Sequence, residues 1–492
     1  MARLSVSTLA TVALVPAVAV PAYGRERAGI GIVHLGIGAF HRAHQAIYTD
    51  DALALAPGDW GICGVSLRSP DVRDALAPQE GLYTAVEKSP AGVHRRIIGS
   101  VREVLFLGDE YDRVAARLAS SDTRIVSLTV TEKGYCHDPA TGKLNLAHPD
   151  IVHDLQHFAR SRSAVGLLTS ALDARRRSHG QPFTVLCCDN LPHNGALLRG
   201  LTLAFAEARE PALARWIDEH ASFPSTMVDR IVPATTASDI ADNDRALGLQ
   251  DAAPVMHEPF KQWAIEDRFV AGRPAWDRVG AQFVTDVAPF EAMKLRLLNA
   301  SHSAFAYLGF LAGHEFIYQV AGQATFVDYM REMMAKEIAP TVQVPAGVDL
   351  VAYQHALIER FKNPALPHRT QQIAMDGSQK LPQRMLATIR DNLIAGRPFD
   401  RLALAVAGWM RYVSGVDEHG RAIKVADPLA AEFARVAAGA RDDPRALARG
   451  LLGLGAIFGD DLASDARFSQ KVGDSLAGLY REGAARMVAR TA

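Results

Sequence analysis

Residues 29–44 read GIGIVHLGIGAFHRAH, and this stretch decides the fold class of the chain. Its first half is a short apolar run typical of a buried strand, and glycines follow it directly. Gly36 and Gly38 match the first two positions of a dinucleotide-binding fingerprint, where one glycine permits a tight turn and the next lets the backbone approach a pyrophosphate. His41 stands at the third position. Because two glycines alone are a weak signal, a plain tight turn remains the alternative.

Further β-rich runs follow at 60–68, 124–130 and 183–188, and segments with helical spacing, such as 109–120, lie between them. Alternating strands and helices predict an α/β fold with a doubly wound parallel sheet of the Rossmann type. Two other runs, LYTAVEK (82–88) and HRRIIGSV (94–101), are joined by the turn residues SPAG. They predict a hairpin inserted into this pattern.

The character of the sequence changes after about residue 290, where strand-like runs become rare and helical periodicity dominates. We therefore expect two domains. Residues 1–285 would form a Rossmann-type dinucleotide-binding domain, and residues 286–492 a mainly α-helical substrate-binding domain.

Charge and cysteine content exclude several classes of protein. Lys and Arg number 53 and Asp and Glu 54, so the chain has no electrostatic reason to bind nucleic acid or an anionic membrane. The four cysteines form no CxxC motif, which argues against a disulfide framework or a zinc ribbon. The apolar stretch 4–23 could be a secretory signal, but Pro16 interrupts it, and an extended arm leading into the first strand is the other interpretation.

The stretch EAMKLRLLNASHSAFAYLG (291–309) is an apolar helix that also carries four polar side chains. On a uniform α-helix of about 100° per residue, Glu291, Lys294, Asn299 and His302 fall on one arc. A lysine in a partly dry pocket can act as a general base, and an amide N–H can stabilise an alkoxide. The imidazole can donate to the same oxygen or hold a neighbouring hydroxyl group. The alternative is a Glu291–Lys294 salt bridge, with Asn299 and His302 as satisfied core polar groups.

Two further candidates stand near predicted strands. Asn190 follows the run 183–188, at the end where ligands bind in parallel sheets, although its DN and NG neighbours are also ordinary turn residues. Asp229 lies in the segment 222–233. Rival catalytic patterns are absent from the sequence: it has no Tyr-x-x-x-Lys, HExxH or GxSxG motif, and the histidines at 148–157 fit a solvated helix face. We therefore predict no metal site.

The choice between NAD and NADP stays open at this level. The second strand is expected to end at Leu67-Arg68-Ser69-Pro70-Asp71. Asp71 could accept a hydrogen bond from the ribose hydroxyl of NAD, whereas Arg68 could accommodate the 2′-phosphate of NADP.

Several longer segments carry a resemblance to a known family, and they span nearly the whole chain in order. They are IVHLGIGAFHRAHQA (32–46), SLTVTEKGY (127–135), CDNLPHNG (188–195), FPSTMVDRIVP (223–233), EPFKQWAIEDRF (258–269), MKLRLLNASHSAFAYLG (293–309), IAMDGSQKLPQRML (373–386) and GWMRYVSGVDEHG (408–420). The chain resembles the long-chain polyol dehydrogenases, which include mannitol 2-dehydrogenase, D-arabinitol dehydrogenase and fructuronate reductase.

The resemblance implies a metal-free, NAD-dependent hydride transfer between a secondary alcohol and a ketone. It also implies a cytoplasmic protein that is a monomer or weak oligomer. By matching motif positions, it assigns the general base to Lys294, the paired amides to Asn190 and Asn299, a proton exit to Glu291, substrate contacts to Asp229, His302 and Lys380, and cofactor contacts to Gly36, Gly38, Ala39, Phe40 and Thr131.

One departure bears on the substrate. Mannitol enzymes of the family have an arginine where this chain has Gln372, and the segment 368–384 looks instead like the hexuronate branch. Lys380 and Arg384, four residues apart, could bind the carboxylate of a sugar acid. We expect D-mannonate/D-fructuronate as the substrate pair. The alternatives are D-mannitol/D-fructose or another polyol and, in a different class, a non-catalytic nucleotide-binding sensor.

Overall fold

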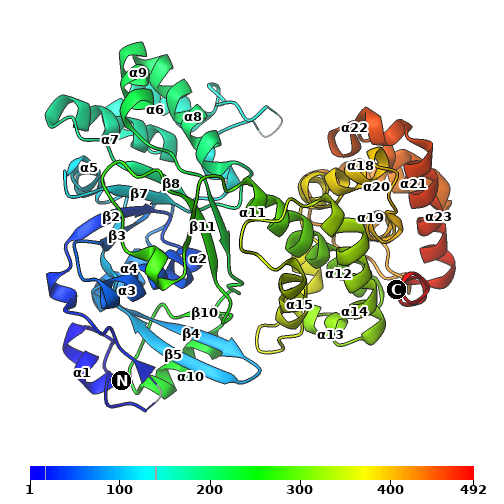
Figure 1. The fold of residues 1–492 in the computed structure, drawn as a ribbon, viewed down its shortest axis with the longest axis horizontal. Coiled ribbons are helices and arrows are strands. Elements are labelled where there is room, and N and C mark those ends of the chain that lie inside the picture. The colour runs from blue at the N-terminus through cyan, green and yellow to red at the C-terminus, as the bar shows by residue number, and fades with distance from the viewer. Residues whose placement is uncertain (17, 139–140) are drawn as a thin grey trace. The chain divides into compact units, whose positions relative to one another are not determined.

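The computed structural model describes residues 1–16, 18–138 and 141–492 (Figure 1). The chain divides into two compact units, Met1–Ala288 and Pro289–Ala492, and each is described by itself.

The centre of the first unit is a five-stranded sheet in the order β6-β3-β2-β7-β8, with every neighbouring pair parallel. Its strands are β2 (Ile30–Leu35), β3 (Gly61–Ser66), β6 (Val101–Phe106), β7 (Ile125–Leu128) and β8 (Thr184–Cys187). The predicted parallel α/β sheet is confirmed. The apolar runs predicted four of these strands but not β6, an edge strand that carries Arg102 and Glu103.

Helices cover both faces of this sheet, because alternate residues of each strand point to opposite sides. Val33, Val65 and Val126 pack under one set of helices, and Ile32, Ile62 and Ile125 under the other. The first set is α5 (Tyr111–Ala119), α6 (Pro149–Gln156), α7 (Ala164–Ser178), α8 (Asn194–Arg209) and α9 (Pro211–His220), at the top of Figure 1. The second set is α2 (Ala39–Ala43), α3 (Gln45–Leu55) and α4 (Asp71–Leu76).

Two smaller sheets complete the first unit. The predicted hairpin is confirmed, because β4 (Tyr83–Ser89) and β5 (Gly92–Ile98) pair in antiparallel fashion. They lie in a separate sheet of order β1-β5-β4-β10, in which β1 is Val18–Ala19 and β10 is Val255–His257. The third sheet has the order β12-β11-β9, with β9 at Thr226–Asp229, β11 at Gln262–Glu266 and β12 at Gln282–Val284.

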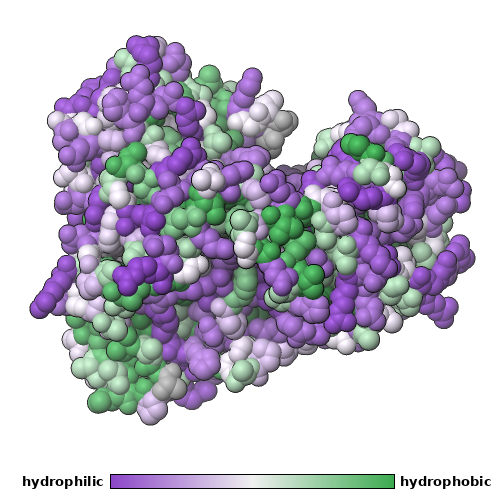
Figure 2. Space-filling view, viewed as in Figure 1, coloured by the Kyte–Doolittle hydropathy of each residue, from purple (hydrophilic) through white to green (hydrophobic). Residues whose placement is uncertain are grey.

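The N-terminal segment is not the extended arm that we expected. It forms a 3₁₀ turn and the short helix α1 (Leu9–Val12), because Leu4 and Val12 can then pack into a small core with residues of β5 and of α10 (Ala237–Leu247). Val6 and Leu14 stay exposed. Figure 2 shows an apolar surface at its lower left, in the region where Figure 1 places α1. Among the described residues, no helix combines the length and apolar character needed to cross a bilayer.

The second unit consists of helices, as predicted. The α-helices are α11 (Ala288–Met293), α12 (Ala300–Leu311), α13 (Ile317–Ala321), α14 (Ala324–Glu332), α15 (Leu350–Phe361), α16 (Thr370–Ile373), α17 (Gly377–Leu381), α18 (Ala387–Ile394), α19 (Asp400–Val413), α20 (Ala430–Ala440), α21 (Pro444–Leu452), α22 (Gly455–Ser464), α23 (Ala466–Glu482) and α24 (Ala484–Thr491). Three π-helical segments interrupt this pattern: η7 (Lys294–Asn299), η8 (Met333–Ile338) and η10 (Pro382–Leu386). Segment η7 packs against both η8 and η10, so all three gather in one part of the unit.

Candidate active site

A cavity of about 270 Å³ lies at the carboxyl ends of β2, β3 and β7 in the first unit. This is the edge of a parallel sheet at which ligands bind. Its lining comes from three loops and the start of α7: Gly36, Ile37, Gly38, Ser66, Leu67, Arg68, Ser69, Thr129, Val130, Thr131, Gly134, Arg162 and Ala164. The predicted residues Gly36, Gly38, Arg68 and Thr131 therefore meet around one cavity.

The glycine turn has the conformation that a dinucleotide site requires. Gly36 has a φ of +93°, and a Cβ there would lie 2.2 Å from the carbonyl oxygen of Thr129, so no other residue fits. Gly38 precedes the first turn of α2, and a Cβ there would meet only the Gly36 oxygen, at 3.8 Å. The space beyond Gly38 is open to a ligand. These residues fit a pyrophosphate.

His41, at the third fingerprint position, is buried beneath this turn. Its ring stacks on His34 of β2 with the centroids 3.5 Å apart, and His34 is itself hydrogen-bonded to Ser127 Oγ at 2.8 Å. Burial lowers the pKa of His34 to about 3, so its imidazole is neutral. Ala39 and Phe40 begin α2, and the ring of Phe40 stacks on His44 at 5.0 Å. The third glycine is thus replaced by a packed aromatic layer.

Thr131 lies in a backbone conformation that only glycine adopts readily, with φ 64° and ψ 164°. Asp189, just after β8, holds this loop. Its carboxylate accepts hydrogen bonds from the backbone N–H groups of Val130 (2.8 Å) and Thr131 (3.0 Å) and from the Tyr135 hydroxyl (2.5 Å). The sequence reasoning missed Asp189, because DN was assigned to turn chemistry. Its place directly after a buried strand was the signal that could have identified it.

The other predicted residues of the first unit are spread more widely. Asn190 is exposed in the bend after β8, and Asp229 is buried at the end of β9, opposite Gln262 of β11. Arg68 is on the cavity wall and pairs with Asp150 at 3.0 Å. Asp71 is exposed at the start of α4 and is not among the lining residues.

In the second unit, Glu291, Lys294, Asn299 and His302 follow one another along α11, η7 and α12. Our prediction of a uniform α-helix over these residues is wrong. The N–H of Ala300 bonds to the carbonyl of Leu295, five residues earlier, so the 100° spacing does not apply across this turn. In π-helical pairing, residue i+5 follows residue i by about one turn, which brings Asn299 next to Lys294 along the axis.

Two nitrogens of this segment are buried without hydrogen-bond partners among the described residues: Asn299 Nδ2 and His302 Nε2. Lys294 and Asn299 are each only 8% exposed. Buried polar atoms are normally paired, so an unpaired one needs a specific explanation. The alternative that Asn299 and His302 are satisfied core groups is therefore wrong. Each nitrogen has a hydrogen bond left to make, which a ligand could supply.

His302 lies in a positively charged environment. Its ring packs against Phe361 and His368, with centroids 5.2 and 5.7 Å away. Burial is the main reason that the pKa of His302 falls well below its usual range, and His368, Arg384, Arg360 and Lys380 lower it further. The imidazole is therefore neutral, with several cationic side chains close by.

Lys380 and Arg384 lie on either side of a second break in the α-helical pattern. Pro382 has no N–H to donate, and η10 begins there. The Lys380 ammonium donates to the carbonyl of Met375 at 2.5 Å, whereas Arg384 Nη1 donates to Ser303 Oγ at 3.0 Å and approaches the Asn299 carbonyl at 3.4 Å. Lys380 and Arg384 thus donate to different segments of the second unit, and Arg384 directly supports the segment that carries Asn299.

Comparisons with known proteins agree with both units. Residues 30–278 match the Rossmann domain of mannitol dehydrogenase, and residues 286–480 match the mannitol dehydrogenase C-terminal domain. The chain is 49% identical to the D-mannonate oxidoreductase of Escherichia coli (strain K12), covering 96% of this chain and 98% of that protein. It is 41% identical to the mannitol 2-dehydrogenase of Pyricularia oryzae, covering 94% and 93%. Among solved structures, the Pseudomonas fluorescens mannitol 2-dehydrogenase ternary complex with NAD and D-mannitol matches with a TM-score of 0.88, 40% identity and 99% coverage of both chains.

Proposed function

The chain belongs to the mannitol dehydrogenase family, and we propose that it is an NAD-dependent oxidoreductase that interconverts D-mannonate and D-fructuronate. One observation carries the proposal: a lysine, an amide and an imidazole follow one another through a π-helical turn, with Asn299 Nδ2 and His302 Nε2 buried and unpaired among the described residues. A base and a donor of this kind are what alcohol oxidation requires.

The first unit would hold the cofactor. Gly36, Gly38 and the start of α2 would bind the pyrophosphate, and Thr131 would line the same cavity. The solved relative at 40% identity is a complex with NAD, which supports this cofactor. When bound, NAD supplies the acceptor for the hydride that leaves the carbinol carbon.

Lys294 would act as the general base. Its neutral Nζ takes the hydroxyl proton as the carbon–hydrogen bond breaks, and it returns that proton to the alkoxide in the reverse reaction. Glu291, one helical turn earlier, would pass the proton onward.

The amides would stabilise the reacting oxygen. Asn299 Nδ2 donates to the negative charge that develops there, and Asn190 takes the second amide position on the strength of its motif. His302 Nε2 would bind a substrate hydroxyl group, and Asp229 keeps the substrate contact that its motif position assigns to it.

Charge favours a sugar acid over a neutral polyol. The charges of Arg360, Lys380 and Arg384 all act on His302 and lower its pKa, although the chain as a whole carries a net charge of only −1. A carboxylate on the substrate matches this local excess of cations. The relative at 49% identity is named D-mannonate oxidoreductase, which supports the same choice.

The second candidate is D-mannitol/D-fructose or another polyol pair. It is favoured by the relatives at 40–42% identity that are named mannitol 2-dehydrogenase and by the solved complex with D-mannitol. A non-catalytic sensor is less consistent with the site, since a sensor needs neither a base nor a donor left unpaired for a reacting oxygen.

A substrate panel tests the proposal. Fructuronate, tagaturonate, fructose and xylulose are each reduced with NADH, and we expect fructuronate to have the highest kcat/KM. A wild-type preference for fructose would promote the polyol candidate. If none of the four compounds were reduced, the non-catalytic nucleotide-binding sensor would be the remaining candidate.

Charge-removing variants test the carboxylate contact. One charge-assisted bond is worth roughly 1.5–3 kcal/mol, so Arg384→Gln should raise the KM for fructuronate about tenfold or more and hardly affect any weak activity on fructose. Because Arg384 also donates to Ser303, Arg360→Gln is the companion variant. Equal losses on both substrates would mean that these arginines support the helix and bind no carboxylate.

A further inference from the structure

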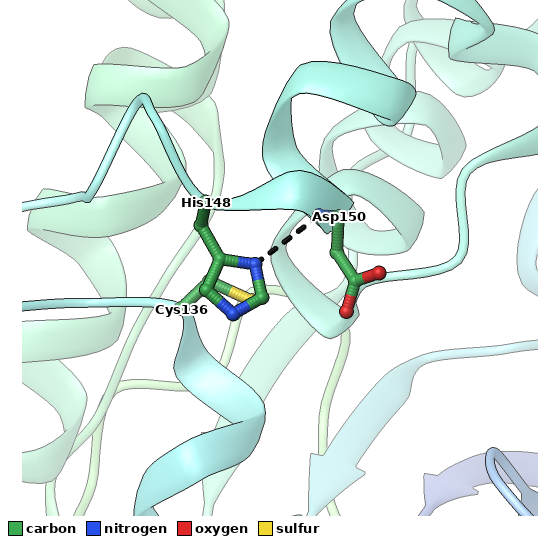
Figure 3. A group of neighbouring side chains, drawn as sticks. All are labelled: Cys136, His148 and Asp150. Atoms are coloured by element: carbon green, nitrogen blue, oxygen red, sulfur yellow. Dashed lines mark hydrogen bonds between the residues drawn. The ribbon is translucent and has the colours of Figure 1, made fainter.

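A cluster of three side chains in the first unit could suggest a metal site. Potential ligand atoms of Cys136, His148 and Asp150 lie within 4.8 Å of one another (Figure 3). The His148 ring nitrogen Nδ1, however, accepts from the backbone N–H of Asp150 at 3.2 Å. The Asp150 carboxylate pairs with Arg68 at 3.0 Å and with Arg162 at 2.9 Å. Burial raises the pKa of the Cys136 thiol to about 11, which keeps it protonated. These contacts account for the cluster without a metal.

A buried arginine beside Asp229 has a more informative set of partners. Arg230 is 8% exposed, and each of its hydrogen bonds within the described residues goes to a backbone carbonyl. Its Nη1 donates to Ala43 at 2.7 Å, and its Nη2 and Nε donate to Glu258 at 2.9 and 3.1 Å. The planar guanidinium can join segments that lie far apart in the sequence, because its donors point in several directions. Arg230 thus joins the end of α2 to the segment that follows β10.

His44 makes a second link between α2 and the strands around Asp229. It is the residue after α2, and its Nε2 donates to the carbonyl of Gln262 at 2.9 Å. Gln262 begins β11 and is the cross-strand partner of Asp229, which ends β9. Two consecutive residues, Ala43 and His44, are therefore bonded to the neighbours of Asp229. One of these neighbours follows it along the chain, and the other lies across the sheet.

Helix α2 connects these bonds to the glycine turn. It contains only the residues Ala39–Ala43, which span about 7.5 Å along the helix axis. Gly38, directly before it, lines the cavity at the carboxyl ends of the central strands. The last carbonyls of a helix have no partner within the helix, so an external donor such as Arg230 determines where that end lies. Fixing the end of so short a helix also fixes its first turn at the cavity.

We propose that Arg230 is a positioning residue that holds Asp229 in a fixed place relative to the glycine turn. It acts through Asp229, because its guanidinium joins the strand end that carries this acid to the helix that begins at the cavity. This inference rests on the proposed function in taking Asp229 as a substrate contact. Hydride transfer needs the substrate at a set distance from the bound dinucleotide, and a displacement of about 1 Å can cost about 10²-fold in rate.

A double-mutant cycle separates positioning from a general loss of stability. The full-length enzyme is assayed at saturating NADH with the best substrate of the panel, as wild type, Arg230→Met, Asp229→Asn and the double variant. Each single variant should lower kcat/KM. We expect the loss caused by Arg230→Met to be about tenfold smaller in the Asp229→Asn background, because residues that act as one network are not additive. Equal losses in the two backgrounds would overturn the inference.

Arg175 provides the matched control. It is 1% exposed, and it donates to the backbone carbonyls of Leu118, Gln181 and Thr123 at 2.8, 3.1 and 2.6 Å. Burial lowers the pKa of both Arg175 and Arg230 to about 10. Arg175 lies in α7, about 16 Å along the axis from Ala164, which lines the cavity. Arg175→Met should lower the melting temperature, yet change kcat/KM by the same factor in the wild-type and Asp229→Asn backgrounds. Non-additivity of the same size for Arg175→Met would reject the special role of Arg230.

A milder variant covers the case in which Arg230→Met does not fold. Arg230→Lys keeps the charge, but one ammonium nitrogen replaces the three guanidinium nitrogens that bond to Ala43 and Glu258. It should show the same non-additivity with Asp229→Asn at a smaller size, and additive losses here would also overturn the inference.

Binding of NADH, followed by fluorescence, tests the link through α2 without turnover. The Arg230 variants should bind NADH several-fold more weakly than the wild type, whereas Asp229→Asn should leave the affinity unchanged. If the wild type reduced no compound of the panel, the proposed function would fail, but these affinities would still decide whether Arg230 holds the glycine turn. Wild-type affinity in the Arg230 variants would overturn the inference.

Discussion

The loop held by Asp189 at the dinucleotide cavity of the first unit differs from the π-helical segment of the second unit in the pairing of its polar atoms. Around the cavity, Asp189 accepts from two backbone N–H groups and a hydroxyl group, and His34 is bonded to Ser127. Along η7 and α12, Asn299 Nδ2 and His302 Nε2 are buried with no partner among the described residues. The Asp189 carboxylate that holds the cavity loop is paired before a ligand arrives, although the ring nitrogens of His41 beneath the turn are unpaired among the described residues. The two nitrogens of the second unit belong to predicted catalytic side chains, and a ligand would complete their hydrogen bonds.

This difference has an energetic meaning. A buried donor or acceptor without a partner costs roughly 1–3 kcal/mol in the folded state. The second unit therefore carries a local instability that a bound substrate would remove. In the first unit, the satisfied bonds instead offset the unfavourable backbone conformation of Thr131, which costs on the order of 1–3 kcal/mol. The predictions below test each side of this contrast.

The largest effect is expected at Lys294. Lys294→Ala should lower kcat for mannonate oxidation by about two to four orders of magnitude, the usual effect of losing a general base. Binding of NADH, followed by fluorescence, should stay close to wild type. The control is Lys336→Ala, an exposed lysine in η8 that pairs with Glu332. A Lys294 variant within threefold of wild type would remove this lysine from the mechanism.

Asn299→Ala should separate activity from stability. Loss of one oxyanion donor lowers kcat by about 10²–10³, and Asn190→Ala should act similarly. Because Asn299 Nδ2 has no partner among the described residues, its removal should not lower the melting temperature. The matched control is Asn392→Ala, whose buried amide donates to the Glu337 carbonyl at 2.7 Å and accepts from Arg397 at 3.0 Å, and which should destabilise the protein. If Asn299→Ala or Asn190→Ala raised only KM, that amide would be a binding contact.

Asp189→Ala should lower the stability of the first unit, in contrast to Asn299→Ala, which should lower activity without lowering stability. The backbone N–H groups of Val130 and Thr131 lose their acceptor, which costs roughly 1–3 kcal/mol of unfolding free energy. Dinucleotide affinity should weaken as well, because Thr131 lines the cavity. Chemical denaturation and nucleotide titration measure the two effects. Unchanged stability would show that this loop does not depend on Asp189.

Acid should destabilise the first unit more than the second. Buried histidines carry pKa values far below the ordinary 6.5: about 3 for His34, His44 and His257, all in the first unit, and about 4 for His368 in the second. The unfolded chain binds these protons below pH 6.5 and the folded chain does not, so stability is full above pH 6.5 and falls as the pH is lowered. At pH 5 each fully buried histidine removes about 2 kcal/mol.

Hydrogen exchange of each unit between pH 6.5 and 5 tests this order. The buried carboxyl groups of Asp50 and Asp251 have raised pKa values and act in the opposite direction, so a variant is needed to isolate the histidines. His44→Gln should reduce the slope of stability against pH by about 1.4 kcal/mol per unit. An unchanged slope would contradict the assignment.

The smallest effect is expected from chelators. EDTA should leave activity unchanged, because the proposed base is an amine and the carboxylate of the Cys136–His148–Asp150 cluster is paired with two arginines. Inhibition by EDTA that zinc reverses would overturn the metal-free mechanism.

The sequence predicted the elements whose residues are uniformly buried. Strands β2, β3, β7 and β8 are continuous apolar runs, since a parallel strand covered on both faces has no polar side. Edge strand β6 has the adjacent charged residues Arg102 and Glu103 inside its apolar run, and the strands of the third sheet are too short to show a period. Their pairing depends on tertiary contacts that a local pattern does not contain.

The site was predictable in its residue types and less so in its geometry. Lys294, Asn299 and His302 stood out as polar residues in an apolar helix, but no propensity distinguishes a π-turn from an α-turn. Asp189 was hidden by its turn-forming neighbours. The pairing of Arg68 with Asp150 joins residues 82 positions apart and has no local signal.

The π-turn at η7 also has a consequence for how this helix can change in length. A π-turn accommodates one residue more than an α-turn, so the run from Ala288 to Leu311 contains one residue that a regular helix would not need. Deleting one residue of η7 would restore regular α-helical winding while the α-helical residues on either side, Glu291 and His302 among them, kept their mutual orientation. The extra residue therefore acts locally: it sets how Lys294 and Asn299 lie within the turn, and a single-residue deletion there would remove that arrangement without shifting the helices on either side.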